Sequence, residues 1–556
     1  MSARRFAGPV AILALVATVL AVCAGASASS DHHPISISGD GDLTADNGVV
    51  SGRGYVHDPF VIEGWDISCG GGAGISIEGT SDHLVIRDVV VTSTDGDEGV
   101  GILLTRVANC TIENLTIEGA RYGIRSLNVV SLTVDGVRIG NCTYGLYLHR
   151  FEDLYVKLVT VHDCIVGMTL ALGEDLVVQG CRVECYTGII IGDHGQTSTR
   201  KVSLLDTTVA GDGRSIDLRN TDDARVGNCT VRNPRWENLR LRNTRGTVLR
   251  DNVLDLGGIA VEGNLGDPDI DISNTVDGSP VRYLRGLEDA VVDGDSGQVF
   301  LVHCENVTVA DQSFDGVLNP IQLLGSANCT VTNCTVTDAY RGLQLYSCKD
   351  FTVTGVSMNS SGSTGGLLTG ISVAGGSGRF EDCHIRDGCA EGLRAHGRAL
   401  ISVCDSTISG FGSCGVQLIP TSLDWGVHEG GFLSLERCII VGNGIGISSY
   451  HWSLGITGTK FEDNVGHAVS SQDDDEVVIT GCSFEDNAVS VSVTSCDDCL
   501  IGWNTIGASN GTGILVSGSY ASISWNNLTG LDAGVLVMDA PDVSLEGNGV
   551  TSVSGP

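Results

Sequence analysis

The sequence predicts an all-β protein that folds as a parallel β-helix, a solenoid of about 20 coils of ~22 residues. Three observations predict this fold: repeat starts at nearly constant intervals, strand-type alternation of apolar and polar residues within each repeat, and 76 glycines with only 10 prolines. Glycine excess at low aromatic content favours many short strands joined by tight turns. The 556 residues are enough to build a sizeable core.

Residues 1–28 predict a secretory signal peptide. Arg4 and Arg5 precede an apolar run from Ala7 to Val22, and the small residues up to Ala28 offer cleavage sites. No later segment reaches the ~18 consecutive apolar residues that a membrane-spanning helix requires. We therefore expect an exported protein without a membrane span, located outside the cell, at the cell surface or in a periplasm-like space.

A small residue followed by an apolar–x–apolar run marks the start of each repeat. Gly101, Gly123, Gly145 and Gly167 begin four consecutive repeats at equal intervals. Three short strands in such a period cannot form a hairpin meander, but they fit one coil of a parallel β-helix whose coils stack about 4.8 Å apart. A leucine-rich repeat has a similar period, but its Leu-x-Leu-x-x-Asn signature does not occur.

The repeats divide the mature chain into an expected cap and two series of coils. Residues 29–73 precede the first regular repeat start, Gly74, and are expected to cap the solenoid. Coils follow over 74–274 and over 298–556. The longer interval between the two series predicts an insertion at 275–297.

The charge balance excludes a nucleic-acid partner. The chain has 32 basic and 67 acidic residues, a net charge of −35. Proteins that bind nucleic acid carry the opposite sign, since they neutralise phosphates with lysine and arginine. Against this acidic background, any local group of arginines is an unexpected feature.

Many of the 20 cysteines occupy fixed positions within the repeat. Cys142, Cys164 and Cys185 each lie three residues before a repeat start, where a neighbouring repeat has Ala120. Cysteine in such a column behaves as a small buried hydrophobe, which favours free thiols. A disulfide set is the alternative, because export permits it and adjacent coils would bring Cys142 within reach of Cys164.

Two segments resemble those of known proteins. Asp58–Ile67, followed by the regular coils, is similar to the entry segment of NosD-like parallel β-helix proteins, and so is Asn274–Leu284. The likeness extends over nearly the whole mature chain and implies a right-handed, single-stranded β-helix. It also implies a surface protein that binds or processes carbohydrate, or a copper-related accessory protein, because NosD itself is associated with copper maturation of nitrous oxide reductase.

Candidate metal ligands are few. Copper sites need methionine, cysteine or histidine at short spacing, and the densest such group, Asp31–His33, lies in an expected extended N-terminus. Asp267, Asp269 and Asp271 alternate along one predicted strand, so that their carboxylates face outward and offer ligands for Ca²⁺. Solvated acidic turns are the alternative interpretation.

The residues two and four positions after each repeat start are expected to form outward columns on one face. Two adjacent coils then place Asp217 and Arg219 beside Arg240 and Arg242, and an insertion at 192–200 carries His194 toward them. Guanidinium groups with neighbouring tyrosines suit carboxylated or sulfated sugars. The alternative is a structural salt ladder from Asp217 to Arg240. The expected ligand-binding face consists of Tyr147, His149, Asp217, Arg219, Arg240, Arg242, Arg394 and His396.

These patterns predict an exported β-helix that binds polysaccharide without catalysing a reaction. The first alternative is a lyase, epimerase or hydrolase that acts on acidic glycans, with Asp217 or His194 as the base and the arginines as neutralisers of the sugar carboxylate. The Gly-His-Gly and Arg-Ile-Lys motifs of polygalacturonases and the Asp-Pro-His-Asp motif of alginate epimerases do not occur. The second alternative is a structural surface rod or a NosD-type copper-related accessory protein.

Overall fold

The computed structural model describes residues 30–95, 98–195, 197–232, 236–262, 268–360, 367–422, 428–507 and 511–552. Within them the chain forms the predicted parallel β-solenoid, and the only helices are two short 3-10 turns, Asp40–Asp42 and Ala45–Asn47. Nowhere in these ranges does a helix have the length and hydropathy of a membrane span. The predicted signal peptide lies outside the described residues.

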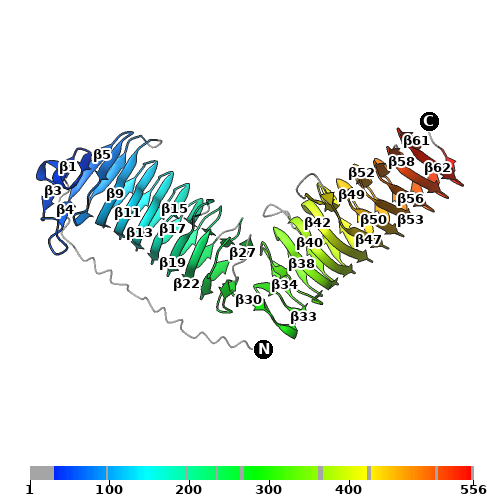
Figure 1. Ribbon diagram of the computed structural model, residues 1–556, viewed down its shortest axis with the longest axis horizontal. Coiled ribbons are helices and arrows are strands. Elements are labelled where there is room, and N and C mark those ends of the chain that lie inside the picture. Colours follow the sequence, from blue (N-terminus) through cyan, green and yellow to red (C-terminus); the bar gives the residue numbers. More distant parts are fainter. Residues whose placement is uncertain are drawn as a thin grey trace, which may run out of the picture.

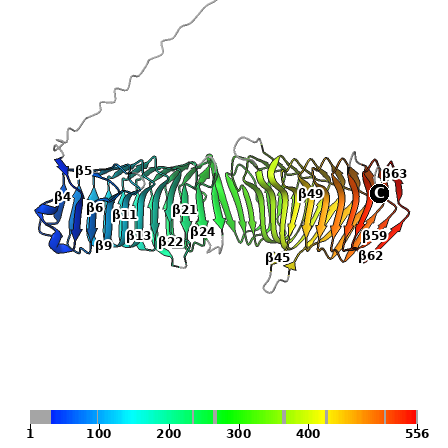
Figure 2. The ribbon, with the colours of Figure 1, turned by 90° about the horizontal axis from the view of Figure 1, so that it is seen from above.

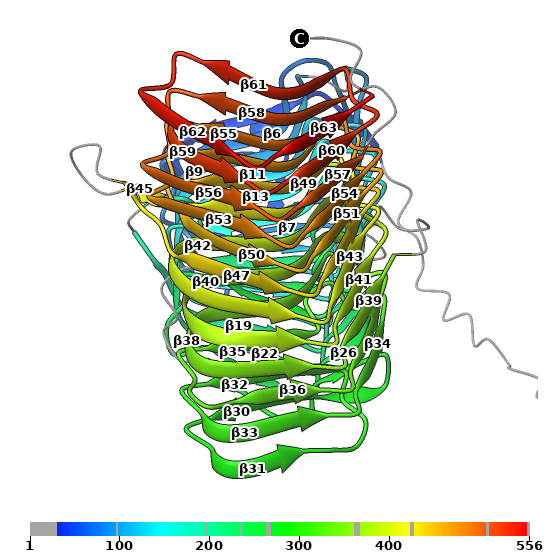
Figure 3. The same cartoon turned by 90° about the vertical axis from the view of Figure 1, so that its right-hand side faces the viewer.

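In several coils the chain forms a long bent strand and a short strand. β11 (Tyr122–Asp135) and β12 (Arg138–Gly140) form one coil, and β13 (Tyr144–Lys157) and β14 (Thr160–His162) form the next. β11 pairs with β13 and β12 with β14, all in parallel, so that Ile124 lies beside Leu146. In other coils the long strand is divided at its bend, and the coils stack as three-sided layers along the rod (Figure 3).

The repeated glycines are required where two coils touch. A Cβ atom on Gly123 would lie 2.6 Å from the carbonyl oxygen of Gly145, and one on Gly145 would lie 2.5 Å from that of Gly167. Non-bonded atoms do not approach so closely, so only glycine fits there. The next residue of each coil points inward, and these side chains form a continuous buried column: Ile102, Ile124, Leu146, Met168, Ile189, Ile216 and Leu239.

Cysteines share the inward columns, as predicted. Every described cysteine except Cys389 is buried, and burial raises the pKa of the Cys110 thiol to about 12. Cys142, Cys164 and Cys185 lie on consecutive coils, and their thiols donate to the backbone carbonyls of Gly140, His162 and Val161. These three are thiols in the structure, in agreement with the favoured prediction.

The N-terminal segment is already part of the solenoid. Residues 29–73 were expected to form a cap, but strands within them supply the first coil. The irregular part is confined to the two 3-10 turns and β3 (Val49–Ser51), which pairs antiparallel with the following strand. The parallel pairs are β2 (Ile35–Ser38) with β6 (Ala73–Glu78), β4 (Phe60–Glu63) with β7 (Leu84–Arg87), and β5 (Trp65–Cys69) with β8 (Val90–Ser93).

The rod bends at residues 275–297, the predicted insertion. β29 (Thr275–Val276) turns back into β30 (Ser279–Arg285), and these two strands pair antiparallel. The segment is a coil rather than an insertion, because β30 and β31 (Glu288–Val292) pair in parallel with β32 (Gln298–Val302) and β33 (Glu305–Ala310). Two arms therefore meet at an angle, with β30 and β33 on the outer side of the bend (Figure 1). Viewed from above, the arms form one line (Figure 2).

Hydrogen bonds join the arms where the ladder of parallel strands is interrupted. The amide of Leu318 donates to the carbonyl of Gly257 at 3.0 Å. The buried side chain of Gln298 accepts from the amide of Ile259 at 2.9 Å and donates to the carbonyls of Ile259 and Asn319, both at 2.7 Å. These bonds hold β27 (Ile259–Glu262) of the first arm near β35 (Ile321–Leu324) of the second.

Candidate functional site

The outward columns predicted from the sequence form as expected. β21 (Ile216–Arg219) and β24 (Leu239–Arg242) pair in parallel, which places Asp217 beside Arg240 and Arg219 beside Arg242. The next pairing, with β27, places Glu262 beside Arg242. We call Asp217, Arg219, Arg240, Arg242 and Glu262 the charged cluster.

The charged cluster is cross-linked by ion pairs. Arg219 donates to Oδ2 of Asp217 from Nε at 2.9 Å and from Nη2 at 2.6 Å. Arg240 donates to Oε2 of Glu262 from Nε at 3.0 Å, whereas its Nη1 lies 3.9 Å from Oδ2 of Asp217. The main ion pairs are thus Arg219 with Asp217 and Arg240 with Glu262, and the predicted contact between Asp217 and Arg240 is the longer one.

Burial differs sharply within the charged cluster. Asp217 is fully buried and the Arg240 side chain is 8% exposed, whereas that of Arg242 is 29% exposed. Burial lowers the pKa of Arg240, but hydrogen bonding and charge from Glu262 outweigh this and raise it above its ordinary value. The Nη2 atom of Arg242 lies 3.5 Å from Glu262. Of these residues, Arg242 is the arginine most open to a ligand.

His194 closes one side of the charged cluster, as the sequence predicted. Its Nε2 lies 2.9 Å from Nη1 of Arg219, and its Nδ1 lies 3.5 Å from Nη1 of Arg242. The loop is held by Asn220, whose Nδ2 donates to the carbonyls of Asp193 at 2.6 Å and Gly195 at 2.9 Å. Asp217 is fully buried and therefore closed to a sugar, whereas His194 is exposed, with both ring nitrogens near guanidinium groups.

Asn220 begins the tripeptide Asn220–Asp222, which reads Asn-Thr-Asp as in polygalacturonases. The expectation of a non-catalytic protein rested in part on the absence of this motif, and that part of the interpretation was wrong. Here the Asn220 side chain serves the loop, since both of its donor contacts go to loop carbonyls. Thr221 is fully buried. The tripeptide is therefore part of the scaffold that holds His194.

An aromatic cluster lies farther along the same face of the first arm. The Tyr147 and His149 rings stack with centroids 4.4 Å apart. Tyr122 and Tyr144 pack against Tyr147, at 5.3 and 5.4 Å, and Arg125 lies over the Tyr122 ring at 5.0 Å. Burial lowers the pKa of His149. The predicted pair thus belongs to a larger group whose other members, Tyr122 and Tyr144, the sequence analysis missed.

Arg394 and His396 lie on the second arm, in the continuation of the outward columns. β42 (Gly388–Cys404) carries both, and Arg394 follows Gln344 and Ser372 in successive pairings. Arg394 Nη1 lies 3.7 Å from Glu391, and its buried Nε has no hydrogen-bond partner among the described residues. Burial lowers the pKa of His396. These two residues are therefore separated from the charged cluster by the bend.

A pocket of about 440 Å³ lies at the bend and receives side chains from both arms. We call it the elbow pocket. Because residues of both arms line one cavity, the pocket lies on the inner side of the bend. Its polar lining comes from Arg240 and Glu262 of the first arm and from Asn319, Gln322, Arg341, Gln344 and Tyr346 of the second.

Three amide side chains in the elbow pocket lack a full set of partners. Gln322 and Asn319 are each 2% exposed, and Gln344 is 4% exposed. Nε2 of Gln344 donates to Oδ1 of Asn319 at 3.0 Å. Within the described residues no other hydrogen bond satisfies these three amides, although buried polar groups are nearly always paired. Nδ2 of Asn319, Oε1 of Gln344 and both amide atoms of Gln322 are left for a ligand.

Arg341 is the elbow pocket's unpaired cation. Its guanidinium carbon lies 5.5 Å from the Tyr340 ring centroid, and it has no carboxylate partner in the described part of the chain. Arg341 belongs to β38 (Arg341–Thr354), which also carries Gln344 and Tyr346. Burial raises the pKa of the Tyr346 phenol. The pocket therefore combines a free guanidinium, three amides and a protonated phenol.

Two of the aspartates predicted as calcium ligands lie next to an arginine in the structure. Asp269 pairs with Arg250, and Asp271 lies 3.9 Å from the same guanidinium. The predicted alternation ends early, because β28 (Asp269–Ile270) stops at Ile270 and Ile272 is 60% exposed. Asp267 lies outside the described residues.

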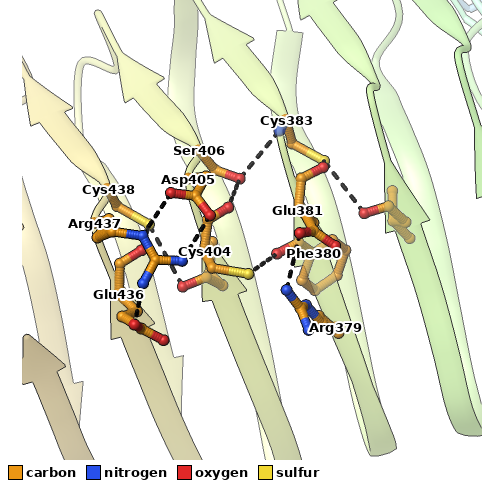
Figure 4. Close-up of polar contacts among 12 residues, drawn as sticks. Arg379, Phe380, Glu381, Cys383, Cys404, Asp405, Ser406, Glu436, Arg437 and Cys438 are labelled. Atoms are coloured by element: carbon orange, nitrogen blue, oxygen red, sulfur yellow. Dashed lines mark hydrogen bonds and ion pairs between the residues drawn. The ribbon is translucent and has the colours of Figure 1, made fainter.

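Glu381, Cys404 and Asp405 bring ligand atoms within 4.8 Å of one another. Two arginines neutralise the carboxylates (Figure 4): Arg437 donates twice to Asp405, at 2.8 Å each, and Arg379 lies 2.9 Å from Glu381. A metal ion would have to displace both cations. The arrangement is that of an ion-pair ladder across three coils.

The N-terminal histidines line a separate hollow of about 720 Å³. The His32 ring packs against Trp65 with centroids 4.7 Å apart, and its Nδ1 lies 2.6 Å from the carbonyl of His33. Asp31 and His33 line the same hollow. Their ligand atoms are not gathered around one point, since the described residues contain only the cluster at Glu381 within metal-binding distance.

Comparisons with known proteins agree with this fold. The model of the right-handed β-helix region matches residues 47–209, 214–370, 298–476 and 467–556. No curated protein matches the sequence significantly. This match does not identify the narrower NosD-like group.

Several solved structures are similar to this chain at low identity and low TM-score. The catalytic unit of an α-1,3-glucanase from Streptomyces thermodiastaticus is 14% identical, with a TM-score of 0.29; the match covers 69% of this chain and 64% of the glucanase unit. The adhesin PfbA of Streptococcus pneumoniae is 13% identical, with 69% and 91% covered and a TM-score of 0.25. The alginate lyase AlyGC is 11% identical, with 94% and 99% covered and a TM-score of 0.28. By its family match and its fold, the chain belongs to the right-handed β-helix family.

Proposed function

We propose that the protein is exported and binds an acidic polysaccharide along the inner face of the bend, without transforming it. The elbow pocket carries this proposal, because three nearly buried amides and one unpaired guanidinium face a single cavity in the described part of the chain. Amide groups offer the donors and acceptors that sugar hydroxyls need. A guanidinium binds a carboxylate through two parallel hydrogen bonds. The pocket therefore suits a carboxylated sugar residue held by Arg341.

The rest of the inner face offers contacts to neighbouring sugar units. On the first arm, Arg242 is partly exposed, and Tyr147 belongs to the aromatic cluster. On the second arm, Arg394 and His396 continue the same columns. A chain that passes through the elbow pocket would meet these residues on either side of it.

The number and pairing of the carboxylates near the elbow pocket favour binding over hydrolysis. Glycoside hydrolysis needs two positioned carboxyl groups. The elbow pocket's lining includes one, Glu262, and it is held by Arg240 and Arg242. Asp217 is fully buried.

A lyase or epimerase would instead need a base near the sugar C5 proton. The candidate in the elbow pocket is Tyr346, and burial raises the pKa of its phenol. A phenol that holds its proton this firmly is a poor base at neutral pH.

A glycan array that includes uronate-containing oligosaccharides tests the proposal. Wild-type protein is expected to bind acidic glycans, and Arg341→Gln to lose about tenfold in affinity, the effect of one charge-assisted hydrogen bond of about 1.4 kcal/mol. Arg138→Gln is the matched control, since Arg138 is exposed on β12 outside the pocket. Binding of no glycan by the wild type would support the structural rod instead.

Incubation with uronate polymers distinguishes binding from lyase activity. We expect no increase in the ultraviolet absorbance of unsaturated products at any pH, with or without Ca²⁺. A steady increase that Tyr346→Phe abolishes would establish catalysis in the elbow pocket and contradict the non-catalytic part of the proposal.

A further inference from the structure

Two tryptophans stand exposed at one corner of adjacent coils on the second arm. Trp503 follows β56 (Asp498–Gly502) and Trp525 follows β59 (Tyr520–Ser524). They are 61% and 53% exposed. The amide of Trp503 donates to the carbonyl of Ser524 at 3.0 Å, which fixes the two corners side by side.

Both tryptophans adopt a backbone conformation that bulky residues avoid. Their φ angles are +55° and +56°, in the left-handed region that favours glycine, asparagine and aspartate. Such residues dominate this corner elsewhere, and strained backbone in a native structure often marks a functional position. Because both indoles are largely exposed, few packing contacts offset the cost of this backbone conformation. At the equivalent corners the chain has Gly64, Asp88, Asn114, Gly136, Leu158, Gly180, Asp206, Asn228, Asp251, Asp311, Asn333, Gly355, Asp382, Asp405, Arg437, Gly458, Gly481 and Gly547.

The corner that carries the tryptophans is rigid. Asn504 and Asn526, the next residues along the chain, point inward and are buried. Nδ2 of Asn504 donates to Oδ1 of Asn526 at 3.0 Å, and Asn526 donates in the same way to Asn548 at 3.0 Å. This ladder holds the backbone from the inside, so the indoles are positioned before any ligand arrives, which lowers the entropic cost of binding.

The Trp525 ring lies against the next coil. A Cβ atom on Gly547 would come within 2.7 Å of this ring, so glycine provides the space for it. Gly481 occupies the same corner on the coil before Trp503. A Cβ atom there would meet nothing closer than 4.0 Å, so this neighbouring corner is open. The two indoles are thus flanked along the rod by glycines, Gly481 on one side and Gly547 on the other.

The residues directly before and after the indoles on their own coils are uncharged, and the nearest charged neighbour in register is Glu546, beside Ser524 on the next coil. Gly502 and Ser524 precede them, and Thr505 and Asn527 begin β57 (Thr505–Gly507) and β60 (Asn527–Thr529) directly after the corner. Thr505 and Asn527 are exposed neighbours in register. On a chain with a net charge of −35, this neutral polar rim favours a neutral ligand with hydroxyl groups.

We propose that Trp503 and Trp525 form a second carbohydrate site, a platform for a neutral pyranose chain that runs along the rod. The electron-rich face of an indole attracts the C–H groups on the apolar face of a sugar ring. Adjacent coils lie about 4.8 Å apart, close to the length of one pyranose unit, so each indole takes one sugar. Thr505 and Asn527 bind the hydroxyl groups at the ring edge. This site is independent of the elbow pocket and differs from it in that no cation lies among the residues directly before and after the indoles.

Indole fluorescence tests the platform directly. Titration of the wild type with neutral hexasaccharides of glucose and of mannose is expected to shift or quench the emission. Trp503→Gly/Trp525→Gly should fold, since glycine is a normal occupant of this corner, and it should lose at least tenfold in affinity by calorimetry. Tyr520→Ser is the matched control, because Tyr520 is a 53% exposed aromatic residue on the same coil at another corner. Arg341→Gln should bind these neutral sugars like the wild type.

Three outcomes would overturn the platform. The first is that no neutral hexasaccharide changes the emission of the wild type. The second is that the glycine double variant, shown by its thermal transition to be folded, binds as tightly as the wild type. The third is a wild-type dimer in sedimentation that the double variant abolishes, which would assign the tryptophans to self-association. If only the elbow-pocket proposal is wrong, the wild type should still bind the neutral hexasaccharides.

Discussion

Nε2 of Gln344 donates to Oδ1 of Asn319 at 3.0 Å, and this bond leaves one amide atom of each residue facing the elbow pocket. Asn319 and Gln344 lie on successive coils of the second arm, whereas Glu262 approaches the same cavity from the first arm. Amide atoms without a protein partner thus line the cavity where the two arms converge.

Gln322→Met should separate binding from stability. The substitution keeps the side-chain volume and removes an amide that has no hydrogen-bond partner in the described part of the chain. We expect the free energy of unfolding to stay equal or to rise by about 1 kcal/mol, while affinity for the acidic glycan falls. Denaturation and calorimetry measure the two effects. A clear loss of stability would mean that the Gln322 amide has a structural role.

Arg240→Ala and Arg242→Ala should differ in stability. Arg240 is nearly buried between Glu262 and Asp217, so its removal deprives Glu262 of its main partner and should cost about 1.5–3 kcal/mol, the value of hydrogen bonds to a charged group. Arg242 is partly exposed, and its removal should cost no more than about 1 kcal/mol. Chemical denaturation compares the variants. Equal losses would contradict the ion-pair arrangement described above, and only Arg242→Ala is a clean probe of binding.

The protein should lose stability as the pH falls below about 6.5, the ordinary pKa of histidine. Burial lowers the pKa of His149 and of His396 in the folded state, so the unfolded chain binds protons more strongly. Their contribution is therefore complete above the unfolded pKa and is lost as the pH falls through the folded pKa. The melting temperature of His149→Gln should depend less on pH between 5 and 7 than that of the wild type. An identical dependence would contradict this assignment.

The buried cysteines should resist thiol reagents in the native state. Burial raises the pKa of Cys110 to about 12 and that of Cys383 to about 11, so thiolate is scarce at these positions at neutral pH. The pKa of Cys496 is instead lowered to about 7 by hydrogen bonding with Cys499, and there burial alone restricts the access of a reagent. We expect rapid labelling at Cys389, the exposed residue, and labelling of the others only after unfolding. Mass spectrometry of the non-reduced protein checks the count. A mass lower by two protons per pair would instead reveal disulfides, first between Cys142 and Cys164.

The period of the solenoid could be predicted because each coil repeats one steric constraint. The carbonyl of Gly145 leaves no room for a Cβ atom on Gly123, and the same contact recurs from coil to coil. The same periodicity predicted the outward columns, so the placement of Asp217 beside Arg240 is confirmed. Local periodicity does not specify pairing within a column, and Arg219 rather than Arg240 is the main partner of Asp217.

The bend and the elbow pocket could not be predicted from the repeat. The hairpin between β29 and β30 reverses the chain for only a few residues, and the longer interval there was interpreted as an insertion. The elbow pocket joins Glu262 to Tyr346, which belong to coils that are not adjacent and become neighbours only through the bend. Gln344 and Tyr346 were recognisable as outward residues, but nothing in the sequence placed them opposite Arg240.

Calorimetric titration with one uronate oligosaccharide and its carboxyl-reduced neutral counterpart tests the central claim most directly. Wild-type protein should bind the uronate form about tenfold more tightly, and Arg341→Gln should bind the two forms equally, since one charge-assisted contact accounts for the difference. Arg138→Gln should retain the wild-type preference. Retention of that preference in Arg341→Gln, or equal binding of both sugars by the wild type, would contradict the assignment of the elbow pocket to a sugar carboxylate.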